Sequence, residues 1–230
     1  MLSKQAIISE LKKHITPSRS ARIEEVVQLR TNYVKVAIED IQQDRNAGAV
    51  IRSCDCFGVQ QVSVIENRYS HKVANSISKG SDKWLDIKKF DTPDQDNTVA
   101  CINSLKNEGF QVVATSPHNH DVELPDFEIT QPTAFLFGTE TEGLSEKALA
   151  LADVKLRIPI YGFTESFNIS VSAALVLQQS VSKLHRSKLP WQLSEDEKMD
   201  IQIDWMLKSL GGAAYEIAKS LGLELPRRHK

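Results

Sequence analysis

The 230-residue chain contains few cysteines and lacks any long apolar run. Its three cysteines, Cys54, Cys56 and Cys101, include no C-x-x-C pair, which argues against a disulfide framework and a zinc site and fits a reducing compartment. No apolar run approaches the roughly 18 residues of a membrane-spanning helix. The first 15 residues carry charges among their apolar positions and so lack a signal-peptide core. We therefore expect a cytoplasmic protein without a membrane segment.

Several motifs of common enzyme classes are also absent. No G-x-G-x-x-G follows the first expected strand, so the sequence gives little support to a dinucleotide-binding domain. The chain lacks G-x-x-x-x-G-K-[ST], which excludes a P-loop, and it lacks G-x-S-x-G. Its six histidines do not have the spacing of metal ligands. We expect no metal, and hydrolase and metalloenzyme functions are disfavoured.

The charge is small overall but unevenly distributed. The net charge is −2, which gives no global sign of nucleic-acid binding. Residues 1–35 hold seven lysines and arginines against three acidic residues, and residues 183–230 hold nine against seven. The two ends together carry +6 and the centre −8. If the protein binds a polyanion, the terminal segments are the expected contact; otherwise these charges form an ordinary solvated surface.

Strand-like and helix-like segments alternate through the middle of the chain. The expected strands are 33–39, 60–66, 84–90, 110–116, 133–138 and 154–160, and the expected helices are 47–57, 72–79, 94–108, 145–151 and 168–184. This alternation predicts an α/β domain over residues 31–187, with a mostly parallel sheet and helices on both faces. The hydrophobic content of 41% is sufficient for a full core.

The ends of the chain are expected to be helical extensions, over 1–30 and 188–230. Pro17 separates two short N-terminal helices, with Ser18 or Ser20 as the cap of the second. The C-terminal segment contains helical patterns at about 194–209 and 213–221, and Ser194 begins a capping box.

Three loops follow expected strands and supply polar residues. Parallel strands present their carboxyl ends at one edge of a sheet, where ligands bind in α/β proteins. The loops are 114–116, 137–140 and 158–168. In the last, Ser166 and Asn168 precede a helix rich in small residues, and Asn168 is placed as its N-cap. This segment is expected to hold a ligand.

Two further polar residues stand out near the first expected helix. Asn46 opens this helix and could be only its N-cap. Arg52 lies among small and apolar residues, where a lone arginine usually extends to solvent or pairs with a carboxylate. Each residue alone is weak evidence for a functional site. Together with the polar residues of loops 137–140 and 158–168, the two residues suggest a composite site.

These segments carry a resemblance to a known family. The stretches 45–59 (RNAGAVIRSCDCFGV), 137–145 (FGTETEGLS) and 158–177 (IPIYGFTESFNISVSAALVL) together resemble the three motifs of the SpoU branch of the SPOUT methyltransferases. The similarity extends through most of residues 18–187 and is greatest to the TrmH group, the tRNA (guanosine-2′-O)-methyltransferases.

The resemblance implies a SPOUT fold with a deep trefoil knot, a homodimer, and S-adenosylmethionine bound in the knotted crevice. The positions that match the family's cofactor-binding residues are Thr115, Gly138, Glu140, Gly143, Ile158 and Phe167. Glycine at 138, 143 and 162 is consistent with close backbone approach, because it has no Cβ.

The resemblance also implies a catalytic role for Arg52, with Asn46, Ser166 and Asn168 around it. A guanidinium with a pKa above about 12 is a poor general base. We therefore favour a role in which Arg52 binds the neighbouring RNA phosphate and polarises the 2′-hydroxyl. A role as base would require a phosphate or a dry pocket to shift its protonation equilibrium.

The expected activity is methyl transfer from S-adenosylmethionine to the ribose 2′-hydroxyl of a tRNA guanosine, at position 18 of the D-loop. One alternative is the same chemistry on ribosomal RNA, although such enzymes often carry a longer N-terminal RNA-binding domain. A second is a non-catalytic RNA-binding module, and a small-molecule nucleotide enzyme is a more distant one. The presence of Asn46, Arg52, Glu140, Ser166 and Asn168 together favours an enzyme.

Overall fold

The computed structural model describes residues 2–69, 80–118, 120–139 and 141–223. The chain divides into two compact units, one formed by residues 31–191 and the other by 1–30 with 192–230. The two terminal segments therefore pack in the same unit, which local sequence patterns did not predict. In the described part of the chain, no helix combines the length and the apolar character needed to cross a membrane.

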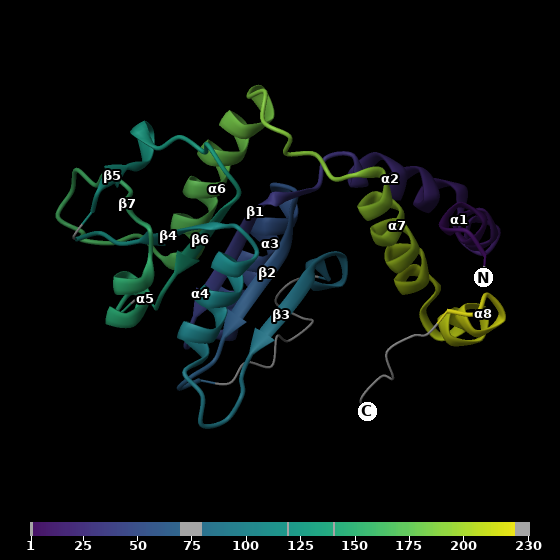
Figure 1. The fold of residues 1–230 in the computed structure, drawn as a ribbon, viewed down its shortest axis with the longest axis horizontal. Coiled ribbons are helices and arrows are strands. Elements are labelled where there is room, and N and C mark those ends of the chain that lie inside the picture. Colours follow the sequence, from purple (N-terminus) through teal and green to yellow (C-terminus); the bar gives the residue numbers. More distant parts are fainter. Residues whose placement is uncertain (1, 70–79, 119, 140, 224–230) are drawn as a thin grey trace. The chain divides into compact units, whose positions relative to one another are not determined.

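The larger unit contains a seven-stranded parallel sheet in the order β3-β2-β1-β6-β4-β7-β5 (Figure 1). The strands are β1 (Thr31–Glu39), β2 (Val59–Ile65), β3 (Asp86–Phe90), β4 (Gln111–Thr115), β5 (Val122–Glu123), β6 (Thr133–Phe137) and β7 (Val154–Arg157). The predicted α/β class with a parallel sheet is confirmed. The expected last strand is shorter than predicted and ends at Arg157, two residues before Pro159, which cannot donate to a sheet ladder.

Helices cover both faces of this sheet. They are α3 (Asp44–Cys56), α4 (Asn97–Asn107), α5 (Glu146–Leu151) and α6 (Ile169–Arg186), with short 3-10 helices at Ser81–Trp84 and Leu124–Asp126. The predicted helix over 72–79 lies outside the described residues. The predicted helix over 94–108 begins later, at Asn97, because the Asp96 side chain accepts a hydrogen bond from the amide of Val99 and so caps it.

The alternation of side chains along the central strands builds two cores. Val36 of β1 and Phe135 of β6 pack with α3 and α6 on one face. Ala37 and Leu136, their neighbours in sequence, pack with α4 and α5 on the other. Successive strand residues point to opposite faces, so a parallel sheet buried on both sides needs these nearly continuous apolar runs.

β7 occupies an unusual position, between β4 and β5, although both of these strands precede it in the chain. Residues that follow β5 are bound to α6, the helix that follows β7. Lys183 donates hydrogen bonds to the carbonyl oxygens of Pro125 and Phe127, each at 2.9 Å, and Gln179 donates to that of Leu124 at 2.6 Å. A late segment thus lies among earlier ones, as expected for the knotted fold.

The smaller unit consists of α1 (Lys4–Lys12), α2 (Pro17–Val27), α7 (Glu195–Leu210), the 3-10 helix Gly211–Ala213 and α8 (Ala214–Ser220). The predicted capping box at Ser194 is confirmed, with Glu197 as its partner. The predicted cap of the second helix is wrong. Thr16 caps α2 and Pro17 takes its first position, where the missing amide hydrogen of proline has no consequence.

Candidate functional site

A cavity of about 330 Å³ opens at the carboxyl ends of β4, β6 and β7, which are neighbours in the sheet. Residues from all three loops singled out in the sequence line it, although they lie far apart in the chain. The third loop, 158–168, contributes Ile158, Ile160, Glu165, Ser166 and Phe167. The insertion of β7 beside β4 is what brings this loop next to the other two.

Five of the six expected cofactor-binding residues line this cavity: Thr115, Gly138, Gly143, Ile158 and Phe167. Glu140 lies outside the described residues. The hydroxyl of Thr115 donates to the carbonyl oxygen of Leu136 at 2.8 Å, so this side chain fixes β4 against β6 at the cavity wall. The structure brings the five together, and their roles stay a prediction.

In the second-motif loop, residues 138–145, the described residues on either side of position 140 are joined by short-range hydrogen bonds. Thr139 and Gly143 exchange two backbone hydrogen bonds, of 3.0 and 3.1 Å, and the Thr139 hydroxyl accepts the amide of Glu142 at 3.0 Å. A Cβ on Gly138 would lie 2.2 Å from the carbonyl carbon and oxygen of Gly143. The close approach predicted for Gly138 therefore comes from its own loop, whereas a Cβ on Gly162 would meet no atom within 4 Å.

The third-motif loop ends at the N-terminus of α6. Asn168 is the N-cap of this helix, as predicted, because its Oδ1 accepts the amide of Ser170 at 2.9 Å and the Ser170 hydroxyl at 2.6 Å. Ser166 lines the cavity, but Asn168 does not.

Asn46 and Asn168 approach each other although 122 positions separate them. The Asn168 amide donates to Asn46 Oδ1 at 3.5 Å, at the limit for a hydrogen bond. The N-cap of α3 is Gln43, so the interpretation of Asn46 as only an N-cap is wrong. Arg52 lies on an exposed part of α3, and neither it nor Asn46 lines the cavity. The predicted catalytic group is therefore only partly assembled, around Asn46 and Asn168.

Several lining residues were not predicted from the sequence. Glu142 and Glu165 add two carboxylates to the wall, and Leu144 and Leu149 add apolar surface. Glu142 and Leu144 lie inside the quoted second motif, so the motif could have revealed them. Leu149 belongs to α5 and carries no local signal of a binding role.

The basic terminal segments are extensively paired with acidic residues. Lys4 lies 2.8 Å from Asp196 and 2.7 Å from Asp200, and these carboxylates, Asp196 first, raise the pKa of Lys4. Lys12 lies 2.7 Å from Glu24. A polyanion that binds these helices would compete with the carboxylates for the lysine side chains. The basic residues of the C-terminal tail, 227–230, lie outside the described residues.

Comparison with known proteins gives consistent results. The model of the SpoU rRNA Methylase family matches residues 33–178. A tRNA (guanosine(18)-2′-O)-methyltransferase of Borreliella burgdorferi is 38% identical over 86% of this chain and 88% of its own. The enzyme of the same name from Escherichia coli K12 is 30% identical over 92% and 90%.

Solved structures are similar as well. The crystal structure of the A. aeolicus TrmH/SpoU tRNA modifying enzyme covers 86% of this chain and 96% of its own, at 30% identity and a TM-score of 0.73. The structure of AviRb from Streptomyces viridochromogenes with AdoMet covers 71% and 62%, at 26% identity and a TM-score of 0.59. These matches confirm the predicted SPOUT fold.

The close contact of Gly138 with the Gly143 backbone can be tested by adding a methyl group at position 138. Gly138→Ala should lower the free energy of unfolding by about 3 kcal/mol, because backbone atoms of Gly143 must move to admit the new methyl group. Gly162→Ala is the matched control and should change it by less than about 0.5 kcal/mol. Chemical denaturation measures both. Equal stability of the two variants would contradict the steric account.

Proposed function

The chain belongs to the SpoU rRNA methylase family, and we propose that it transfers a methyl group from S-adenosylmethionine to the ribose 2′-hydroxyl of guanosine 18 in the tRNA D-loop. The relatives that match most of this chain support guanosine 18 by their names. One observation carries the proposal: residues of the second and third family motifs line a single cavity beside the polar end of α3.

The cavity residues fit S-adenosylmethionine in chemistry and in size. Ligand pockets in this size range are mostly apolar with a few polar groups. Leu144, Leu149 and Ile158 offer apolar surface for an adenine ring. Glu165 lines the cavity and can place a carboxylate near a cofactor that carries ammonium and sulfonium charges. When bound, this cofactor supplies an electrophilic methyl group.

The chain's own residues would bind and orient the RNA. Arg52 is exposed and can offer a planar fork of donors to a phosphate, which would place the adjacent ribose and polarise its 2′-hydroxyl. Asn46 and Asn168 lie together where α3 and α6 begin and can orient the same ribose. Ser166 reaches the cavity from the loop before Asn168 and can contact cofactor and ribose. Positioning of this kind supplies much of the rate in a displacement reaction.

Methylation of ribosomal RNA is the second candidate. A 23S rRNA (uridine(2479)-2′-O)-methyltransferase of Streptomyces viridochromogenes is 25% identical over 67% of this chain but matches only 54% of its own length. The tRNA relatives cover more of both chains at higher identity, and this difference favours tRNA.

The proposal includes a cytoplasmic homodimer. Val171 and Leu175 are exposed apolar residues four positions apart in α6, so they form a short apolar stripe on its first turns. Phe167, just before the N-cap of this helix, is also partly exposed. Tyr161 and Phe163, in the loop before this helix, are almost fully exposed. Several exposed large apolar side chains within one short segment are typical of a protein interface. A second copy of the chain would cover them.

The substrate is tested by incubating the purified protein with methyl-labelled S-adenosylmethionine and either bulk tRNA or ribosomal RNA. We expect label in tRNA, mapped to the ribose of guanosine 18. A tRNA transcript with deoxyguanosine at position 18 is the matched control and should accept no label, because it lacks the 2′-hydroxyl. Label in ribosomal RNA and none in tRNA would overturn the choice of substrate.

Arg52 provides a test of the proposed chemistry. Arg52→Ala should lower kcat by about 100-fold or more, and Arg52→Lys by about tenfold, because lysine lacks the planar fork. The cofactor Kd should not change, since Arg52 does not line the cavity. Arg186→Lys, an exposed change at the end of α6, is the control and should retain full turnover. Full turnover of Arg52→Ala would refute the assignment.

The proposed dimer interface predicts a change in molecular mass. Val171→Glu places a charge in the apolar stripe and should convert the dimer to a monomer, because burial of an unpaired carboxylate is strongly unfavourable. Light scattering coupled to size exclusion measures the mass. Leu29→Glu, at an exposed leucine in the other unit, should leave it unchanged. A dimeric Val171→Glu protein would place the interface elsewhere.

A further inference from the structure

The second-motif loop separates the candidate cofactor cavity from a second hollow. Glu142, Gly143 and Leu144 line both. The second hollow, of about 480 Å³, also contains Glu39, Asp40, Asn67, Arg68 and Thr98, from the ends of β1 and β2 and the start of α4. Groups of this hollow that do not line the cofactor cavity contact the loop, Arg68 at Glu142 and Glu39 at Ser145.

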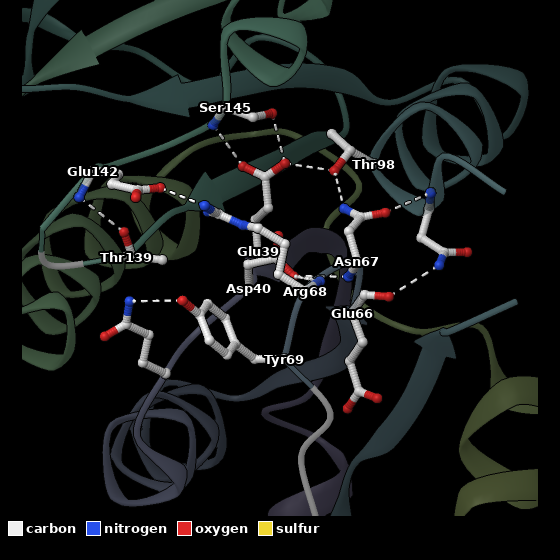
Figure 2. Close-up of polar contacts among 12 residues, drawn as sticks. Glu39, Asp40, Glu66, Asn67, Arg68, Tyr69, Thr98, Thr139, Glu142 and Ser145 are labelled. Carbon is white, nitrogen blue, oxygen red and sulfur yellow. Dashed lines mark hydrogen bonds and ion pairs between the residues drawn. The ribbon is translucent and has the colours of Figure 1, made fainter. Parts of the chain in front are cut away.

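Glu39 holds the end of this loop. It is the last residue of β1 and only 3% exposed, and its carboxylate accepts three hydrogen bonds (Figure 2). Two come from Ser145, from its amide at 2.8 Å and its hydroxyl at 2.7 Å, and one comes from the Thr98 hydroxyl at 2.5 Å. Since Ser145 is the N-cap of α5, Glu39 fixes the junction between the loop and this helix.

Asp40 holds the chain that follows β2. Its φ of 48° is left-handed, a conformation in which aspartate and asparagine are the common non-glycine residues. One carboxylate oxygen accepts the amides of Asn67 at 2.7 Å and Arg68 at 3.0 Å, and the other accepts Arg68 Nε at 3.2 Å. Asp40 is 4% exposed, so the Arg68 side chain extends from a buried anchor.

Arg68 connects this anchor to the loop. Its Nη1 donates to Glu142 Oε2 at 2.6 Å, and Figure 2 shows the guanidinium reaching from Asp40 toward Glu142. The loop's own contacts there are the Thr139–Gly143 pair and the hydroxyl of Thr139 on the Glu142 amide. None of these restrains the Glu142 carboxylate, whose orientation therefore depends on Arg68.

We propose that Arg68, anchored by Asp40, is a positioning residue that presets Glu142 and the second-motif loop for S-adenosylmethionine. This inference rests on the proposed function. Without Arg68 the loop and its carboxylate are less ordered before binding, and binding must then order them, which weakens affinity. Arg68 acts through Glu142 and across the loop, so it affects cofactor affinity rather than the methyl-transfer step.

The first test is equilibrium binding of S-adenosylmethionine to the full chain by calorimetry. Arg68→Ala should raise Kd about tenfold, as expected for loss of a charge-assisted hydrogen bond. The KM for cofactor should rise in parallel, while kcat at saturation and the KM for tRNA stay within about twofold of the original. Lys106→Ala, which removes a similarly exposed ion pair with Asp153 at 2.6 Å in the same unit, is the control and should leave Kd unchanged.

A double-mutant cycle tests the route through Glu142. Arg68→Ala made in a Glu142→Gln background should raise Kd by less than about twofold, because its partner charge is already absent. Arg68→Lys should recover part of the lost affinity. Asparagine at position 40 can adopt the left-handed backbone, and its Oδ1 can still accept the two backbone amides. Its side-chain NH2 would face Arg68 Nε in place of the carboxylate oxygen, so Asp40→Asn should also raise the cofactor Kd.

The outcomes separate the two proposals. An unchanged cofactor Kd in Arg68→Ala, with a raised KM for tRNA, would show that Arg68 contacts RNA and would overturn the positioning role alone. If the effects of the two substitutions on the free energy of cofactor binding are fully additive, Arg68 does not act through Glu142. If the unaltered protein binds no S-adenosylmethionine, the proposed function fails, and this inference fails with it.

Discussion

The insertion of β7 between β4 and β5 is the constraint on which the rest of the larger unit depends. β7 pairs with β4 through Val154–Leu156, and the amide of Ser116 donates to the carbonyl oxygen of Leu156 at 2.9 Å. These bonds set the start of loop 158–168 beside the loops that follow β4 and β6. The cavity exists because a late strand takes a place between two earlier ones. The cavity and the knotted topology therefore have one structural cause.

The packing of α3 against α6 positions the residues that are proposed to contact RNA. Ala47 of α3 and Ala173 of α6 are buried in the same core, and small residues allow helices to approach closely. The first turns of the two helices then lie near each other, which brings Asn46 to Asn168. Neither asparagine lines the cavity, so the proposed functions of cofactor binding and ribose orientation fall on different groups of residues.

The sequence predicted the secondary-structure elements better than it predicted which segments pack against each other. Strand periodicity and helix caps such as Asn168 are local signals, so the α/β class and the loops at strand ends could be read directly. The pairing of residues 1–30 with 192–230 depends on contacts between distant segments, which local patterns do not encode. Asn46 was only a candidate N-cap of α3, and the true cap, Gln43, could not be recognised because it makes no side-chain capping hydrogen bond.

The residues behind the second-motif loop show why a motif describes only part of a site. Glu39 and Asp40 follow the apolar run of β1, where acidic residues normally mark solvent. Both are buried instead, because donors from α4, the end of β2 and the 138–145 loop converge on them. A buried carboxylate requires such donors, and the donors in turn become fixed by it. The position of this glycine-containing loop is therefore determined by side chains outside the loop, which no pattern within the motif can reveal.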